Sequence, residues 1–215
     1  ERTGFKISPD GINISFLAPY QNRLNIFLQD EKGKPNRLTS ITDRDLRNYF
    51  WANDETILFL KDKDGDENHH LFKTNIHTLE TVDLTPFDGA KVAVVDKLHD
   101  QPDNVLIQAN LNDHRLFDVY NLNIENGEMK MVAKNPGNVT SWGTDHDGKV
   151  RLAFTTDGVN TSIQHRRNED DEFKTIANTT FRETLIPQFF SFDNQYLFAL
   201  SNIGRDKLSA IEFDL

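Results

Sequence analysis

The stretch SPDGINISFLA at residues 8–18 decides the fold, because similar stretches recur along the chain. Aligned with WANDETILFLK at 51–61, it places Asp10 over Asn53. The later counterparts are QPDNVLIQAN (101–110), HDGKVRLAFT (146–155) and SFDNQYLFAL (191–200). Each copy joins a turn signal to an apolar run, which predicts a tight turn followed by a buried strand.

The repeating unit is about 40–50 residues long and carries several strands, which is typical of a β-propeller blade. No segment keeps a helical apolar period for more than about two turns. A four-stranded blade cannot bury either face alone, whereas packing between blades covers both faces, so inner strands such as TILFL (56–60) can be apolar throughout. The sequence therefore predicts an all-β chain of propeller blades.

We expect one partial propeller domain over residues 1–215, with five repeats of which the last is incomplete. The expected repeats span about 6–48, 49–91, 92–138, 139–184 and 185–215. The fifth repeat has room for only two strands, and residues 1–6 could add at most one closing strand, so we expect an open or partial ring. Exposed strand edges would favour self-association of such a chain.

Composition limits the classes of partner. Lys and Arg number 24 against 34 Asp and Glu, which gives a formal net charge of −10. Nucleic acids and anionic membranes bind cationic surfaces, so neither is an expected partner. The absence of cysteine excludes disulfides and thiolate chemistry but leaves the compartment open between cytoplasm and periplasm.

GTDHDGKV at 143–150 fits the phosphate-binding pattern G-x-x-x-x-G-K, except that Val150 replaces the Ser or Thr that would hold magnesium. A phosphate loop leads from a strand into a helix, whereas the following VRLAF continues as a strand. Asp145 and Asp147 would also place negative charge where the phosphate would lie. We therefore predict a turn in which Gly148 supplies the dihedral freedom, and no nucleotide or other cofactor.

DKDGDENHH at 62–70 carries acids at alternate positions, as calcium-binding loops do. The candidate ligands are Asp62, Asp64 and Asp66. However, the glycine precedes the third acid instead of following it, and Lys73 stands where the pattern has Glu. These departures favour a solvated hairpin loop, so no metal site is predicted.

No catalytic residue is predicted either. The nucleophile motif G-x-S-x-G needs two glycines four positions apart, and no pair of glycines in the chain has that spacing. The remaining candidate contacts are Arg205 and Asp206 within SNIGRDK (201–207). They could line one rim of the ring, or pair with each other to hold their turn, and the second interpretation is favoured.

The ordered series of phrases resembles a known family. LFLKDKDGDENHHLF, VDLTPFDGAKV, FDVYNLNIENGE, NPGNVTSW and FSFDNQYLFALSNIGRDKLSAIEFD are similar to the amino-terminal propeller of bacterial serine peptidases of the prolyl oligopeptidase family. Within that family the resemblance is to the branch of dipeptidyl aminopeptidases and acylaminoacyl-peptidase-like enzymes. It covers essentially all 215 residues.

This resemblance implies a propeller of about seven blades followed by an α/β-hydrolase domain that bears Ser, Asp and His. The propeller would cap the active site and admit only short peptides or unstructured chain ends. The expected partners are therefore that hydrolase domain and short peptides. The present chain lacks the hydrolase domain and the paired-Glu motif that anchors the substrate amine in one branch. A stand-alone propeller that scaffolds protein partners is the alternative.

Overall fold

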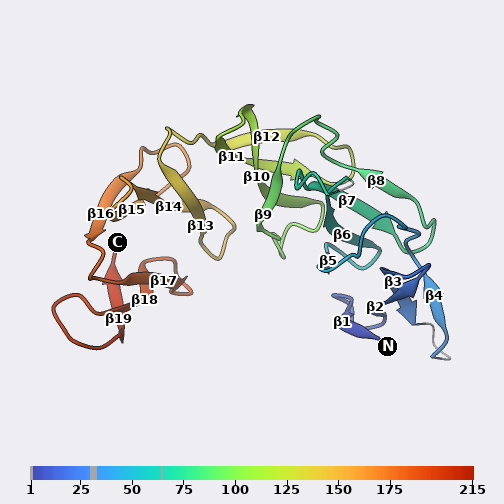
Figure 1. Ribbon diagram of the computed structural model, residues 1–215. Coiled ribbons are helices and arrows are strands. Elements are labelled where there is room, and N and C mark those ends of the chain that lie inside the picture. Colours follow the sequence, from blue (N-terminus) through green and yellow to red (C-terminus); the bar gives the residue numbers. More distant parts are fainter. Residues whose placement is uncertain (1, 30–32, 64) are drawn as a thin grey trace. The chain divides into compact units, whose positions relative to one another are not determined.

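A computed structural model describes residues 2–29, 33–63 and 65–215 (Figure 1). Nineteen β-strands and no helix are found in these residues, which confirms the all-β prediction. Within the same ranges, no helix long and apolar enough to cross a membrane is present.

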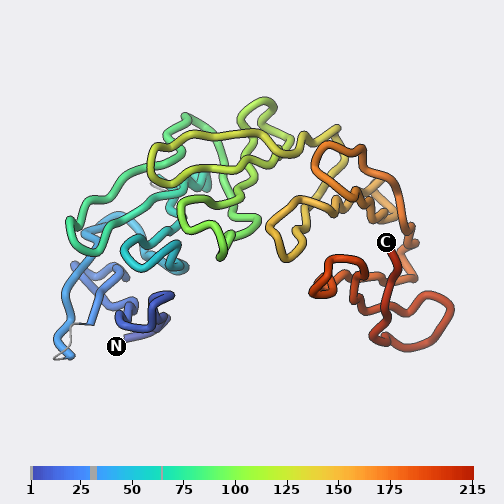
Figure 2. The backbone as a smooth tube through the Cα atoms, turned by 180° about the vertical axis from the view of Figure 1, so that it is seen from behind, coloured from blue at the N-terminus to red at the C-terminus, as the bar shows by residue number. Residues whose placement is uncertain are grey.

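The strands form five sheets, in each of which consecutive strands are neighbours, so the chain runs up and down (Figure 2). The first sheet contains β1 (Thr3–Ile7), β2 (Ile14–Tyr20), β3 (Arg23–Gln29) and β4 (Pro35–Arg37). The second contains β5 (Tyr49–Trp51), β6 (Thr56–Lys61), β7 (His70–Asn75) and β8 (Thr81–Asp83). The third contains β9 (Val92–Asp96), β10 (Asn104–Asp113), β11 (Leu116–Asn123) and β12 (Met129–Ala133).

The last two sheets differ in strand number. The fourth contains β13 (Val139–Thr144), β14 (Val150–Thr156), β15 (Thr161–His165) and β16 (Lys174–Thr179). The fifth contains β17 (Leu185–Phe190), β18 (Tyr196–Ser201) and β19 (Ser209–Asp214). The prediction of five repeats with an incomplete last one is thus confirmed. The prediction that the fifth repeat holds only two strands was wrong. Three strands fit because the segment before the turn at 191–195 forms its own strand, β17, paired with β18.

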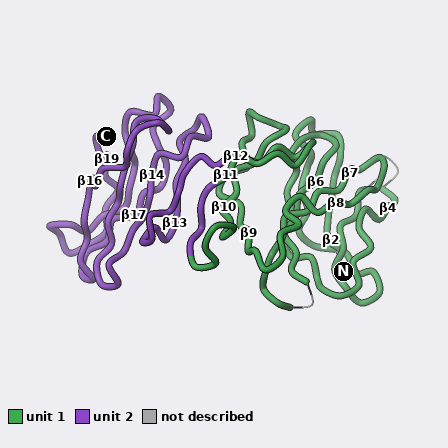
Figure 3. Tube along the Cα trace, turned by 90° about the horizontal axis from the view of Figure 1, so that it is seen from above, with its two compact units in different colours: residues 1–115, 120–130 green, residues 116–119, 131–215 purple. Residues whose placement is uncertain are grey.

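Contacts divide the chain into two compact units (Figure 3). Unit 1 comprises residues 1–115 and 120–130, and unit 2 comprises residues 116–119 and 131–215. Strands β11 and β12 contribute residues to both units.

In unit 1, strand β6 is buried on both faces, as its continuous apolar sequence predicts. Ile57 and Phe59 pack in a cluster that includes residues of the first sheet, and both are at most 1% exposed. Leu58, between them, packs in the opposite cluster with residues of the third sheet, such as Val105 and Ile107. Alternation of side chains along a strand sends neighbouring residues to opposite faces, so β6 joins two layers of core.

In unit 2, a smaller apolar cluster joins the fourth and fifth sheets. Leu152 and Ile163 of the fourth sheet pack with Phe190 and Leu197 of the fifth. Beside this cluster lies a group of buried polar side chains, which is the first candidate for a functional site.

Candidate functional site

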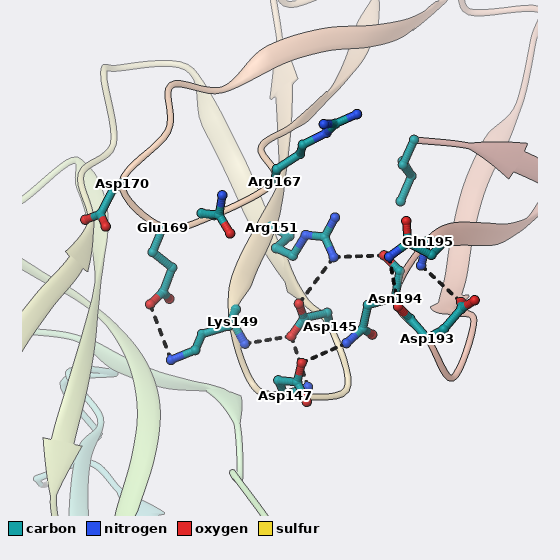
Figure 4. A pocket seen from close by; sticks show the side chains of 12 residues that line it. Asp145, Asp147, Lys149, Arg151, Arg167, Glu169, Asp170, Asp193, Asn194 and Gln195 are labelled. Atoms are coloured by element: carbon teal, nitrogen blue, oxygen red, sulfur yellow. Dashed lines mark hydrogen bonds and ion pairs between the residues drawn. The ribbon is translucent and has the colours of Figure 1, made fainter.

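The first candidate, here called the seam cleft, is a hollow of about 750 Å³ in unit 2 (Figure 4). Three connections line it, at 145–149, 167–170 and 193–195. The first is the turn with the phosphate-loop resemblance. It joins β13 to β14, with Gly148 at φ +69°, so the predicted turn is confirmed.

Asp145 organises this turn from a buried position. One carboxylate oxygen accepts hydrogen bonds from the backbone N–H of Asp147 at 3.0 Å and of Lys149 at 2.9 Å. The other lies 3.5 Å from Nη1 of Arg151. Asp145 thus stabilises the turn itself.

Arg151 links this turn to the fifth sheet. It is 8% exposed, and its Nη1 donates to the carbonyl of Asn194 at 2.9 Å (Figure 4). Its Nε donates to the carbonyl of Arg166 at 3.2 Å, and its Nη2 lies 2.9 Å from Nε2 of His165. An arginine can only donate, so the imidazole is the acceptor and is neutral. Burial, followed by repulsion from Arg151 and Arg167, lowers the pKa of His165 to about 4.

Arg166 is a second buried arginine and is 6% exposed. It donates to three backbone carbonyls, those of Val150 at 2.7 Å, Glu169 at 2.6 Å and Val132 at 3.1 Å. Its guanidinium also lies 4.6 Å from the ring centre of Phe173. Burial lowers its pKa from the usual arginine value, although nearby acids oppose that shift.

Among the other charged groups of the seam cleft, two form an ion pair and a third accepts a hydrogen bond from an amide (Figure 4). Lys149 lies 3.8 Å from Glu169, and Asn194 donates to Asp147 at 2.9 Å. Figure 4 shows Arg167 pointing away from Asp145. The seam cleft is therefore a junction at which hydrogen bonds link the fourth and fifth sheets beside two ion pairs within the fourth, and its lining carries five acids against three cations.

The second candidate, here called the arginine cleft, is a hollow of about 690 Å³ in unit 1. Its described cationic residues are Arg23, Arg44, Arg47, Lys61 and Lys91. Its described acids are Asp43, Asp45, Asp62 and Glu67. Cations thus outnumber acids here, in a chain whose net charge is −10.

Two ion pairs form the base of the arginine cleft. Lys61 Nζ lies 2.8 Å from Asp43, and Arg44 Nη2 lies 2.9 Å from Asp62. The Arg44 guanidinium, helped by the backbone N–H of Glu67, lowers the pKa of Asp62 to about 2. These pairs join the segment before β5 to the end of β6.

Comparisons with known proteins find two peptidases that are similar to this chain. No protein-family model matches the chain. It is 28% identical over 222 residues to dipeptidyl aminopeptidase BIII of Pseudoxanthomonas mexicana, in an alignment that covers 100% of this chain and 32% of that protein. It is 26% identical over 229 residues to dipeptidyl peptidase family member 6 of Caenorhabditis elegans, covering 96% and 30% of the two chains.

A solved structure from a structural and mechanistic analysis of two prolyl endopeptidases matches 99% of this chain and 34% of its own, with a TM-score of 0.69 and 11% identity. The five sheets are propeller blades, and at least 96% of the chain is similar to part of these peptidases. The resemblance seen in the sequence is thereby confirmed. This propeller segment spans about a third of the length of the curated relatives that it matches.

Two of the three candidate metal ligands interact with other groups of the protein. Asp62 is the partner of Arg44, and Asp66 accepts hydrogen bonds from the backbone N–H of Asn68 at 3.0 Å and of Lys63 at 3.3 Å. Asp64 lies outside the described residues. No group of three His, Asp or Glu residues that could hold a metal ion occurs in the part of the chain that the structure describes.

The candidate rim residues lie in the connection between β18 and β19. Arg205 and Asp206 are both exposed, and the backbone N–H of Arg205 donates to the carbonyl of Asn202 at 3.0 Å. The ion pairs found within the described ranges do not include one between these two side chains. A rim contact by either residue stays a prediction.

Sequence reasoning missed the buried network around Arg151. A signal was present, because Arg151 lies four residues after the turn Asp147, where the matching position of other repeats holds Ile14, Ile57 or Leu197. A charged residue at a repeated apolar position indicates a local polar core, but the partners come from other strands and turns.

Proposed function

We propose that this propeller segment restricts the access of peptides to a Ser-Asp-His hydrolase domain in a longer serine peptidase and supplies no bond-breaking residue itself. The observation that carries the proposal is the match of the whole chain to part of a dipeptidyl aminopeptidase. The two sequences are 28% identical over 222 residues, and the alignment covers 32% of that protein. The missing G-x-S-x-G motif supports the second half of the proposal.

The physical basis is exclusion by a rigid wall. Strands such as β6 are buried on both faces, so the sheets cannot part without exposing core. A wall of this kind beside a hydrolase site keeps folded proteins out. It also limits bulk water, which strengthens the interactions that stabilise developing charge at the acyl carbon.

The contacts of two histidines, His70 and His165, support a non-catalytic role. His70 Nδ1 lies 2.8 Å from Asp83, which resembles the orienting half of a catalytic triad. None of the hydrogen bonds found among the described residues joins a Ser or Thr hydroxyl to this imidazole. The buried His165 already uses its Nε2 to accept from Arg151. Neither histidine is arranged to activate a serine.

The test uses the full-length protein and peptides of increasing length that share one cleavable end. We expect kcat/KM to fall steeply beyond short peptides and to reach background for a folded protein with the same end. Cleavage of the folded protein at the rate of the short peptide would contradict the restriction of access. A full-length protein without any peptidase activity would instead favour the scaffold alternative.

Self-association of the isolated chain is also part of this proposal. The fifth sheet and its turns leave large apolar side chains exposed, including Ile186 at 48%, Phe189 at 59% and Phe192 at 97%. Contiguous apolar surface favours association. Light scattering should show a mass that rises with concentration, and a constant monomer mass up to millimolar concentration would contradict it.

A further inference from the structure

Arg23 and Arg47 of the arginine cleft lie on two backbone segments that hydrogen bonds hold side by side. The backbone N–H of Leu46 donates to the carbonyl of Leu24 at 3.0 Å, and the N–H of Leu24 donates to Oδ1 of Asp45 at 2.8 Å. Arg23 and Arg47 each lie one residue from this bridge, and both line the cleft. Their side chains are exposed, and none of the ion pairs within the described ranges includes either of them.

The loop that carries Arg47 is held on several sides. Leu46 is 1% exposed and belongs to the core of unit 1. The side-chain amide of Asn25 donates to the carbonyl of Ile41 at 2.8 Å, and the N–H of Ile41 donates back to Oδ1 of Asn25 at 2.8 Å. The ion pairs of Asp43 and Arg44 fix the stretch between these anchors. Little conformational entropy would be lost if a ligand used this loop.

The hairpin loop after β6 is adapted to the same arrangement. Gly65 has φ +89°, and a Cβ built on it would lie 2.7 Å from Nη2 of Arg44. Arg44 is thus held between Asp62 and a glycine that leaves room for it. With Arg44 and Lys61 paired to Asp62 and Asp43, the described charged lining residues outside these ion pairs are the cations Arg23, Arg47 and Lys91 and the acids Asp45 and Glu67, so cations exceed acids by one.

We propose that the arginine cleft binds a carboxylate group of a peptide, with Arg23 and Arg47 as the main contacts and Lys91 as a further positive charge. The planar guanidinium group donates two parallel hydrogen bonds to a carboxylate, which makes arginine the suited residue. The proposal rests on the proposed function in one respect, namely that peptides reach this propeller segment.

The test is an NMR titration of the 215-residue chain with three capped peptides. Acetyl-Ala-Glu-Ala-amide presents a side-chain carboxylate, acetyl-Ala-Ala-Ala presents a chain-end carboxylate, and acetyl-Ala-Gln-Ala-amide is the neutral control. We expect at least one of the two carboxylate peptides to shift the amide signals of residues 23–24 and 44–47, and the neutral peptide to leave them unchanged. Which of the two binds distinguishes a side chain from a chain end.

Substitution separates a built site from general charge attraction. The double variant Arg23→Gln with Arg47→Gln should weaken binding at least tenfold while the rest of the spectrum stays unchanged. The matched control is Arg115→Gln, because Arg115 is an exposed arginine of unit 1 that pairs with Asp113 away from the cleft. This control should bind as the unmodified chain does.

Equal binding of the neutral peptide, or equal weakening by the control substitution, would overturn the proposal, as would the absence of any shift. The measurement needs no hydrolase domain. Failure of carboxylate binding is therefore distinguishable from failure of the access restriction, which is measured on the full-length protein by peptide length.

Discussion

Two strands at matching places in the repeat, β6 in unit 1 and β14 in unit 2, fill the same position in opposite ways. Ile57 follows the turn residue Asn53 by four positions and is fully buried in an apolar cluster. Arg151 follows Asp147 by four positions and is 8% exposed among polar groups. A blade position therefore accepts a charged side chain when neighbouring strands supply enough hydrogen-bond partners.

The two solutions depend on different forces. Ile57 needs only close packing, whereas removing Arg151 from water costs several kcal/mol that its partners must offset. Beside both positions a hydrogen bond joins the turns of neighbouring sheets, with a backbone donor in unit 1 and a side-chain donor in unit 2. In unit 1 the N–H of Asp10 donates to Asp54 at 2.8 Å, and in unit 2 Asn194 donates to Asp147 at 2.9 Å. What differs is the core between the sheets, which is apolar around Ile57 and polar around Arg151.

The largest expected effect is that of Arg151→Ala, which leaves Asp145 buried without its cation and two backbone carbonyls without donors. We expect a loss of about 3–5 kcal/mol in the free energy of unfolding, measured by urea denaturation. Arg115→Ala, at an exposed arginine, should leave the unfolding curve unchanged. A loss below about 1 kcal/mol for Arg151→Ala would show that the polar network contributes nothing essential.

The second prediction concerns pH. The pKa of His165 is lowered from the ordinary histidine value of 6.5 to about 4 in the folded chain, because the imidazole is buried beside Arg151. Between pH 4 and pH 6.5 the unfolded chain therefore binds more protons than the folded chain. The contribution of His165 to the free energy of unfolding is complete above pH 6.5 and is lost as the pH falls towards 4. The loss should reach about 3 kcal/mol, from 1.36 kcal/mol for each pH unit.

The variant His165→Gln isolates this effect, because an amide oxygen can still accept from Arg151 but does not titrate. The difference in unfolding free energy between the unmodified chain and this variant should change between pH 6.5 and pH 4. A difference that stays constant over that interval would contradict the neutral, buried imidazole.

A smaller effect is expected for Ile57→Val, which removes one methylene from the apolar core. The free energy of unfolding should fall by about 1 kcal/mol. Because no charge is involved, the loss should be the same at low and high salt and at pH 4 and 6.5. Strong dependence on salt would show that the core of unit 1 also relies on charged groups.

The smallest effect is expected for Asn194→Ala, which removes two side-chain hydrogen bonds between exposed turns, one donated to Asp147 and one accepted from the N–H of His146. The expected loss is about 1 kcal/mol or less, because water replaces the missing partners. Proteolysis at the turn, followed by mass spectrometry, should become faster in this variant. An unchanged cleavage rate would show that the side chain of Asn194 does not hold the turns together.

The sequence predicts the fold well because the fold depends on patterns that repeat. The turn at Gly148 and the doubly buried strand around Leu58 both follow from local residue order. The seam cleft could not be predicted, because His165 and Arg166 meet Arg151 only through the pairing of β14 with β15. The arginine cleft is similar, since Arg23 and Arg47 become neighbours through one backbone bridge.

The most direct test of the central claim, that this propeller segment shapes access without breaking bonds, is labelling with a serine-reactive fluorophosphonate. The 215-residue chain and the full-length protein are treated side by side, and labelled peptides are identified by mass spectrometry. We expect that a serine outside the segment is labelled in the full-length protein and that the 215-residue chain takes up no label. Stoichiometric labelling of a serine within the chain, with matching peptide hydrolysis, would contradict it.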